Sequence, residues 1–164
     1  MEQSKIEYKV IKELREKDIT VFTAESCTGG MICKLLTDVS GASSCVKGGV
    51  VCYVNEIKTG ILGVDEAVID AHTEISAECA EAMAECARRI SGSDIGLSTT
   101  GYASGGEGVP SDMAGVVYLG ISDKNGTCVY RVKFEGGRDK VRIDASRKIL
   151  ELLYSKLVLG ERER

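Results

Sequence analysis

A short run of small and polar residues carries the side chains best suited to chemistry in this sequence. Residues 24–30 read AESCTGG and place a hydroxyl and a thiol, Ser26 and Cys27, directly before Thr28, Gly29 and Gly30. A turn of this kind at a helix start leaves backbone N–H groups free to hold an oxyanion or a phosphate. We therefore predict an active-site turn, against the alternative of a helix start with small residues for tight packing.

A serine nucleophile needs a base. The only histidine, His72, lies between two predicted helices, and nothing in the sequence ties it to Ser26, so a Ser-His-Asp triad is not favoured. Lys58 is another candidate base, because it follows the predicted strand that ends at Tyr53 and is expected near the same edge of the sheet. A solvated surface lysine is the alternative for Lys58. Cys27 is the alternative nucleophile, since helix N-termini stabilise thiolates.

Two further segments are expected at the same edge of the sheet. Thr100 lies at the carboxyl end of the third predicted strand, directly before a glycine-rich loop over residues 101–112, which lacks the Gly-Lys-Ser/Thr ending of a phosphate-binding P-loop. Arg138 follows two glycines at the start of the last helix, where a guanidinium can bind a phosphate through two hydrogen bonds. The alternative for residues 101–112 is a mobile surface loop, and the alternative for Arg138 is an exposed arginine at a helix start.

Hydrophobic periodicity predicts the elements that must position these residues. Ile6, Val10 and Leu14 mark a first amphipathic helix, and Ser76 is a natural N-cap for a long helix that extends to Ile90. The remaining predicted elements are strands over 19–23, 45–53 and 94–99, helices over 31–38, 55–62, 66–71 and 138–157, a loop over 40–44, and a hairpin of strands 114–122 and 127–134. This order predicts an α/β fold class, a single-domain three-layer α/β/α sandwich with a mixed sheet over residues 1–164. In such folds ligands bind beyond the carboxyl ends of the strands.

The composition excludes several classes of function. With 164 residues, 43% hydrophobic and 28% charged, the chain is expected to form one globular domain. A net charge of −4 argues against a nucleic-acid partner. The polar N-terminus and the lack of a long apolar run predict no signal peptide and no membrane span, hence a cytoplasmic protein. Seven scattered cysteines without a CxxC pair indicate reduced, mostly buried thiols and argue against a zinc site.

The motifs taken together resemble those of the CinA C-terminal domain family, which includes stand-alone nicotinamide mononucleotide (NMN) deamidases. The resemblance begins with residues 23–30 (TAESCTGG) and continues in order through 36–43 (LTDVSGAS), 48–51 (GGVV), 53–58 (YVNEIK) and 134–139 (FEGGRD). It implies a three-layer domain that hydrolyses the carboxamide of NMN to nicotinic acid mononucleotide and ammonia. It also implies that no metal or other cofactor takes part, that the substrate is a small nucleotide, and that the protein forms a homo-oligomer.

The resemblance also implies a role for each candidate residue. Ser26 matches the family's nucleophile, and Lys58 and Tyr53 match its activating partners, with Lys58 taking the Ser26 proton. The implied substrate-binding residues are the helix-start amides that hold the oxyanion, at Thr28, Gly29 and Gly30, together with Thr100 and the phosphate-binding Arg138.

The glycine-rich loop departs from the family pattern. The family usually reads Gly-Ile-Ala-Gly-Pro-x-Gly-Gly and then Lys-Pro-Val-Gly-Thr-Val, whereas this chain has GYASGG at 101–106 and MAGVV at 113–117. The usual proline and the later lysine are missing. Two alternatives to an NMN deamidase therefore stay open: a catalytically inactive nucleotide-binding module, and a related amidase with another carboxamide substrate.

Overall fold

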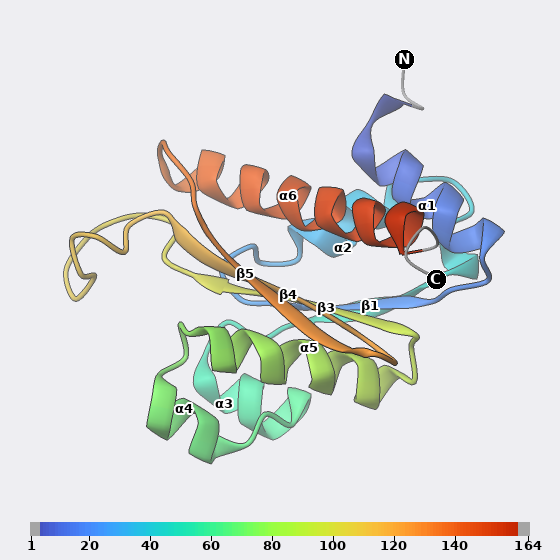
Figure 1. The fold of residues 1–164 in the computed structure, drawn as a ribbon. Helices are drawn as coiled ribbons and strands as arrows, with labels where there is room; N and C mark the ends of the chain where they lie inside the picture. Colours follow the sequence, from blue (N-terminus) through green and yellow to red (C-terminus); the bar gives the residue numbers. More distant parts are fainter. Residues whose placement is uncertain (1–3, 161–164) are drawn as a thin grey trace.

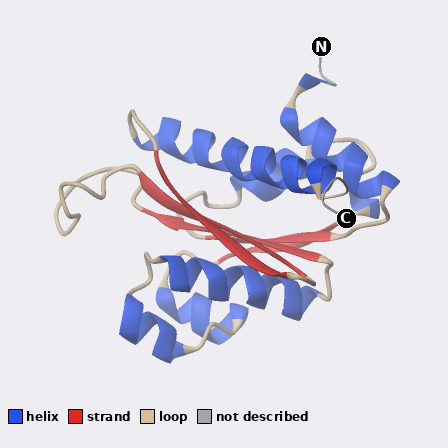
Figure 2. Cartoon of the chain, viewed as in Figure 1, coloured by secondary structure: helices blue, strands red, loops and turns tan. Residues whose placement is uncertain are grey.

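Five strands form a mixed sheet between two layers of helices in the computed structural model, which describes residues 4–160 (Figures 1 and 2). The strand order is β2-β1-β3-β4-β5. β1 (Val21–Glu25) pairs in parallel with β2 (Val46–Val51) and β3 (Ile95–Gly101), and β4 (Val116–Asp123) is antiparallel to both β3 and β5 (Gly126–Lys133). Residues 1–3 and 161–164, which the prediction of one domain includes, lie outside the described residues.

The helices divide between the two faces of the sheet, which confirms the predicted three-layer α/β/α architecture. One face is covered by α1 (Ile6–Glu16), α2 (Met31–Thr37) and α6 (Arg138–Leu159), drawn above the sheet in Figure 1. The other is covered by α3 (Asn55–Ile57), the π-helical turn η3 (Lys58–Leu62), α4 (Glu66–His72) and α5 (Ala77–Ser91). The predicted loop at 40–44 contains a short 3-10 helix, η2 (Ala42–Ser44).

Alternation along the strands sends side chains into two separate apolar clusters. Val21 and Leu97 pack with α1, α2 and α6 in the larger cluster, whereas Ala24 packs with Leu62 and Met83 in the smaller one beside η3 and α5. Neighbouring residues at the end of β1 therefore face opposite layers of the molecule. This alternation decides where Glu25 and Ser26 point.

Several predicted boundaries shift by a few residues. β1 starts and ends two residues later than predicted, because Ala24 and Glu25 still pair with Val50 and Val51 of β2 and with β3. The first two residues of the predicted turn therefore belong to the strand. The Ser76 cap is confirmed, since its Oγ accepts the Cys79 amide at 3.1 Å. Within the described part of the chain, no helix combines the length and apolar character that a membrane span requires.

Candidate active site

Ser26 and Lys58 meet in the interior, at the carboxyl end of β1. Lys58 Nζ lies 3.4 Å from Ser26 Oγ, and the two residues are 1% and 8% exposed. Ser26 follows β1 directly, and Lys58 is the first residue of η3. The Lys58 amide donates a hydrogen bond to the Val54 carbonyl at 3.2 Å. The structure thus brings the predicted nucleophile and base within reach of each other, although apo contacts of this kind are often longer than in the working complex.

Tyr53 contacts the site through two different groups. Its backbone carbonyl accepts a 3.4 Å hydrogen bond from Lys58 Nζ, while its phenol accepts a 2.8 Å hydrogen bond from the Arg138 guanidinium. The Tyr53 side chain is 57% exposed, so the phenol and Arg138 stand at the surface. In the structure the Tyr53 carbonyl contacts Lys58, and the Tyr53 phenol contacts Arg138, the predicted phosphate-binding residue. Among the described residues, no hydrogen bond joins the phenol to Ser26.

Cys27 points away from Ser26 and into the larger apolar cluster, where it is 5% exposed. Burial raises the pKa of the Cys27 thiol to about 12 and outweighs the lowering effect of the local backbone. The nearby Glu25 carboxylate raises this pKa further, and Arg142 and Arg138 lower it. The expected stabilisation of a thiolate at a helix start is therefore outweighed by desolvation. A neutral, buried thiol is a poor nucleophile, so the geometry favours Ser26.

The start of α2 is already occupied by a carboxylate of the chain itself. Glu25 is fully buried, and its oxygens accept the amides of Gly30, Ile32 and Cys33 at 2.8–3.0 Å. The Gly29 amide is also used, since it donates to the Ser26 carbonyl at 3.1 Å. Of the predicted oxyanion donors, Gly29 and Gly30 are thus engaged within the turn.

The amides of Cys27 and Thr28 donate to no other residue among residues 4–160, and the only group that the Cys27 amide acts on is its own thiol. Arg142 of α6 fixes the direction of one of them, because its Nε donates to the Cys27 carbonyl at 3.1 Å and its Nη2 to the Thr28 carbonyl at 3.2 Å. In a trans peptide the C=O of Cys27 and the N–H of Thr28 point in opposite directions. The Thr28 amide therefore points away from Arg142.

Gly29 allows this approach of Arg142. It has a φ of +62°, and a Cβ on it would lie 2.9 Å from an Arg142 nitrogen. A side chain there would both strain the backbone and push the guanidinium away from the turn. The positive φ and the close guanidinium therefore both favour glycine at this position, where Arg142 of α6 docks on the turn.

The two threonines at the end of β3 face opposite layers. Thr99 Oγ1 lies 2.7 Å from Thr28 Oγ1, whose own proton goes to Glu25 at 2.7 Å, so Thr99 is the donor to Thr28. Thr100, the predicted substrate-binding residue, donates its hydroxyl to the Glu74 carbonyl at 2.6 Å on the other face. Because the Thr100 hydroxyl proton is used in that bond, the Thr100 oxygen can serve a ligand only as a hydrogen-bond acceptor.

Other candidates lie apart from this cluster. His72 ends α4, is exposed, and has its Nδ1 3.6 Å from Glu78, so no described contact links it to Ser26. A cavity of about 300 Å³ separates the glycine-rich loop from residues 133–136, just before Arg138. In the described chain, no group of three or more His, Cys, Asp or Glu side chains is arranged to hold a metal ion.

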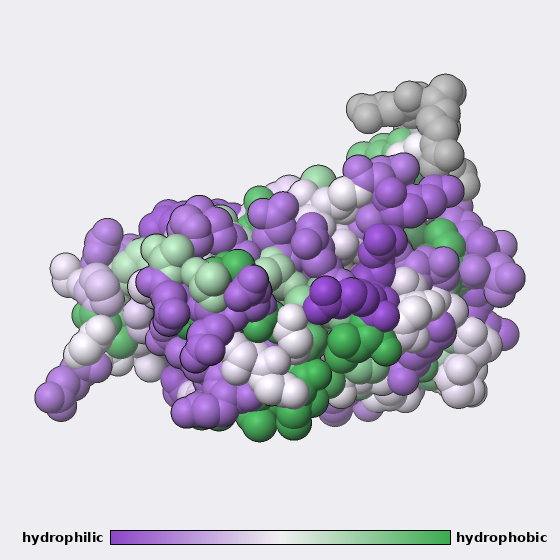
Figure 3. All heavy atoms as spheres, turned by 90° about the horizontal axis from the view of Figure 1, so that it is seen from below, coloured by the Kyte–Doolittle hydropathy of each residue, from purple (hydrophilic) through white to green (hydrophobic). Residues whose placement is uncertain are grey.

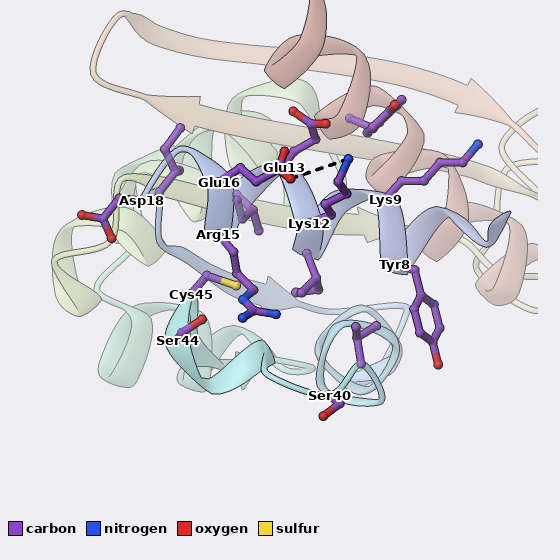
Figure 4. Close-up of a pocket in the computed structure, with 15 residues that line it drawn as sticks. Tyr8, Lys9, Lys12, Glu13, Arg15, Glu16, Asp18, Ser40, Ser44 and Cys45 are labelled. Atoms are coloured by element: carbon purple, nitrogen blue, oxygen red, sulfur yellow. Dashed lines mark ion pairs between the residues drawn. The ribbon is translucent and has the colours of Figure 1, made fainter. Parts of the chain in front are cut away.

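A cavity of about 1040 Å³ lies between α1, residues 39–45 and Tyr154. Figure 4 shows that charged side chains of α1 surround it, among them Lys12 and Glu16, which form an ion pair at 3.6 Å. None of the predicted site residues lines it. Its position on the α1 side separates it from the Ser26–Lys58 contact.

Sequence reasoning missed Glu25 and Arg142 as members of this site. A signal existed for Arg142, because it lies four residues after Arg138 and a helix places such residues on one face. A signal also existed for Glu25, since a carboxylate just before a helix start often accepts its free amides. Both residues shape the turn.

A family model described as the CinA C-terminal domain matches residues 3–157 of this chain. Among curated relatives, a CinA-like protein of Leptospira borgpetersenii is 44% identical over 145 residues, which cover 88% of this chain and 35% of the relative. A CinA-like protein of Myxococcus xanthus is 43% identical over 150 residues, covering 91% and 36%. The chain thus spans about a third of the length of the curated relatives that it matches.

A solved structure with a similar fold is the competence/damage inducible protein of Agrobacterium tumefaciens. It superposes with a TM-score of 0.85 at 32% identity, covering 92% of this chain and 94% of the other. The agreement extends over nearly the full length of both chains.

Proposed function

This chain belongs to the CinA C-terminal domain family, and we propose that it is an amidohydrolase that converts NMN to nicotinic acid mononucleotide and ammonia. The observation that carries an acyl-transfer mechanism is the buried contact of 3.4 Å between Ser26 Oγ and Lys58 Nζ. The choice of NMN rests on the resemblance of the motifs to those of NMN deamidases.

The first half of the proposed reaction forms an acyl-enzyme. Ser26 Oγ attacks the carboxamide carbon of NMN, and its proton passes to the amine nitrogen of Lys58. The negative charge that develops on the carbonyl oxygen is held by the free amides of Cys27 and Thr28. The C–N bond then breaks, Lys58 gives the proton to the departing nitrogen, and ammonia leaves.

The second half restores the enzyme. A water molecule attacks the ester carbon, Lys58 accepts one proton of that water, and the same amides hold the second tetrahedral intermediate. The bond from the ester carbon to Ser26 Oγ breaks, and Lys58 returns the proton to Ser26. The product leaves as the carboxylic acid and gives its proton to water or to the released ammonia, so the net reaction consumes one water and releases one ammonia per NMN.

Tyr53 and Arg138 have supporting roles in this proposal. The Tyr53 carbonyl orients Lys58, and the phenol steadies the Arg138 guanidinium, which binds the substrate phosphate. Thr100 lies at the end of β3 on the same face as η3, where its oxygen can accept a hydrogen bond from the substrate. These assignments give Tyr53 a part in activation through its backbone.

A homo-oligomer, as the family resemblance implies, is also part of the proposal. Large apolar side chains are exposed along β2, α3 and η3, at Val51, Val54 and Ile61. Figure 3 shows apolar surface on the layer of the molecule that holds α3 and η3. Exposed apolar surface of this kind is typical of a surface that another chain covers.

The test of the proposed function is an ammonia-release assay with NMN and purified protein, alongside the variant Ser26→Ala. Release by the parent protein and none by the variant is expected. Tight binding of NMN without turnover would instead favour an inactive binding module, and turnover of other carboxamides alone would favour a related amidase. A Ser26→Ala protein with full activity would rule out the assigned nucleophile.

A further inference from the structure

Glu25 is a fully buried carboxylate that the proposed reaction does not use directly. It precedes Ser26, yet strand alternation sends its side chain to the opposite face of the sheet, toward α2. Its two oxygens accept hydrogen bonds from three amides of the α2 start and from the Thr28 hydroxyl, all at 2.7–3.0 Å. These bonds tie the chain segment before Ser26 to the start of α2.

The Glu25 side chain also fills the position where an external anion would otherwise bind. A helix start with free N–H groups attracts negative charge, and here the three amides that point along α2 already have a partner. The amides that stay free are those of Cys27 and Thr28, which lie one and two residues after Ser26. An oxyanion formed at Ser26 is thereby directed to these two amides and away from the axis of α2.

The backbone of Glu25 is also connected to Lys58, through the end of β2 and the residues that follow it. The Glu25 carbonyl accepts the Cys52 amide at 2.9 Å, and the following residue, Tyr53, holds Lys58 Nζ through its carbonyl. Lys58 in turn contacts Ser26, which closes a ring of contacts that begins and ends at the Glu25–Ser26 pair. A shift of Glu25 would therefore move both the nucleophile and its base.

A hydrogen-bonded chain anchors this carboxylate to the centre of the sheet. Thr99 of β3 donates to Thr28, and Thr28 donates to Glu25. Each hydroxyl in such a chain polarises the next, and all three groups are buried. The position of the turn relative to β3 is thus fixed by side chains in addition to the bond from the Ser26 amide to the Thr99 carbonyl.

We propose that Glu25 is a positioning residue for the Ser26 reaction: its carboxylate occupies the start of α2, fixes the turn, and reserves the Cys27 and Thr28 amides for the oxyanion. The inference rests on the proposed role of Ser26 as nucleophile. It makes the rate of Ser26 chemistry depend on the Glu25 carboxylate, beyond the contribution of Glu25 to stability.

Two variants separate positioning from stability. Glu25→Gln keeps the size of the side chain but turns an amide NH₂ toward N–H donors, whereas Asp94→Asn makes the same carboxylate-to-amide change at an exposed acceptor at the other end of the same strands. Asp94 accepts both the amide and the hydroxyl of Thr20, at 2.8 and 2.7 Å, just before β1 and β3 begin. Both variants should lose stability, and Glu25→Gln alone should lose reactivity at Ser26.

The direct readout is the rate at which a fluorophosphonate probe labels Ser26, measured by mass spectrometry in the folded proteins. We expect Ser26 labelling in the parent, a rate about 10- to 100-fold lower in Glu25→Gln, and the parent rate in Asp94→Asn. With NMN, kcat should fall in Glu25→Gln while KM stays near the parent value. Equal labelling of parent and Glu25→Gln, equal slowing in Asp94→Asn, or an unlabelled parent would overturn the inference.

A second pair of variants applies if Glu25→Gln does not fold. Thr99→Val removes the hydroxyl that supports Thr28 and should slow labelling about 2- to 10-fold, whereas Thr99→Ser should restore the parent rate. Equal rates in both would contradict the inference. A parent protein that is labelled at Ser26 but releases no ammonia from NMN would refute the proposed substrate while the labelling rates still decide the role of Glu25.

Discussion

Lys58 Nζ lies 3.4 Å from Ser26 Oγ although the two residues are 32 positions apart in the sequence. Their meeting depends on β1 and β2 being parallel neighbours, because both residues follow the carboxyl ends of these strands. Lys58 is 1% exposed and makes no ion pair with a carboxylate in the described part of the chain. The neighbours of its amine are oxygen atoms of Ser26 and Tyr53.

Replacement of Lys58 by methionine should remove activity while the fold persists. Methionine fills a similar volume but offers no base, so the Ser26 proton has no acceptor and ammonia release from NMN should fall about 100- to 10,000-fold. The exposed Lys12, on α1, gives a matched control, and Lys12→Met should retain the parent kcat. Steady-state kinetics and circular dichroism check both. A Lys58→Met protein with more than a tenth of the parent activity would exclude the base.

Replacement of Tyr53 by phenylalanine should change substrate binding more than chemistry. The variant keeps the carbonyl on Lys58 and loses only the bond between the phenol and Arg138. We expect KM for NMN to rise about 2- to 10-fold with kcat within about threefold of the parent. Arg138→Lys should raise KM by at least as much. If kcat fell strongly at unchanged KM, the phenol itself would take part in proton transfer.

Replacement of Cys27 by alanine should leave catalysis intact. Burial raises the pKa of the Cys27 thiol to about 12, so this group stays protonated, and it contributes no inflection to the rate profile between neutral and mildly alkaline pH. The variant should lose about 1–2 kcal/mol of stability from the deleted apolar contact. In the native parent, iodoacetamide should modify the exposed Cys128 and spare Cys27. Loss of activity in Cys27→Ala would reopen the thiol as nucleophile.

The elements with clear periodicity were predictable, and the fine geometry of the site was not. The Ser76 cap and the hairpin turn at Lys124–Asn125 have local sequence signals, and the structure confirms them. The end of β1 depends instead on pairing with β2 and β3, which extends the strand through the polar Glu25. The hydrophobicity of a segment does not show which strands it pairs with.

The contact partners of each site residue also could not be predicted from the sequence. Alternation could have separated Thr99 from Thr100, but only the register with β1 shows that Thr99 is the one facing Thr28. The free amides at Cys27 and Thr28 emerge only once Glu25 is seen to occupy the start of α2. The pattern of residues 24–30 indicated an oxyanion site, and the contacts within the turn select its donors.

The stability lost in Asp94→Asn should depend on pH in a defined direction. Hydrogen bonds from the Thr20 amide and hydroxyl lower the pKa of the Asp94 carboxyl below 3.8, against a smaller opposing effect of burial. A lowered folded-state pKa stabilises the protein above the unfolded-state value, and this contribution is lost as the pH falls through the folded-state value. The parent should exceed the variant by about 1 kcal/mol at neutral pH, a figure that allows for solvent screening.

Urea unfolding of both proteins at several pH values measures this difference. The gap should close as the pH falls below 3.8, because the protonated Asp94 then resembles the asparagine. If the difference in unfolding free energy between the two proteins stayed constant down to acidic pH, the Thr20 hydrogen bonds would not favour the charged form of Asp94.

The proposed hydrolysis of the NMN carboxamide by Ser26, activated by Lys58, is tested by one pair of assays. These assays measure the release of ammonia and nicotinic acid mononucleotide from NMN, in equal amounts, by the parent protein and by Ser26→Ala. We predict sustained turnover by the parent and a loss of at least about 1,000-fold in the variant, with unchanged circular dichroism. Equal rates in the two proteins, or no product from the folded parent, would contradict the account.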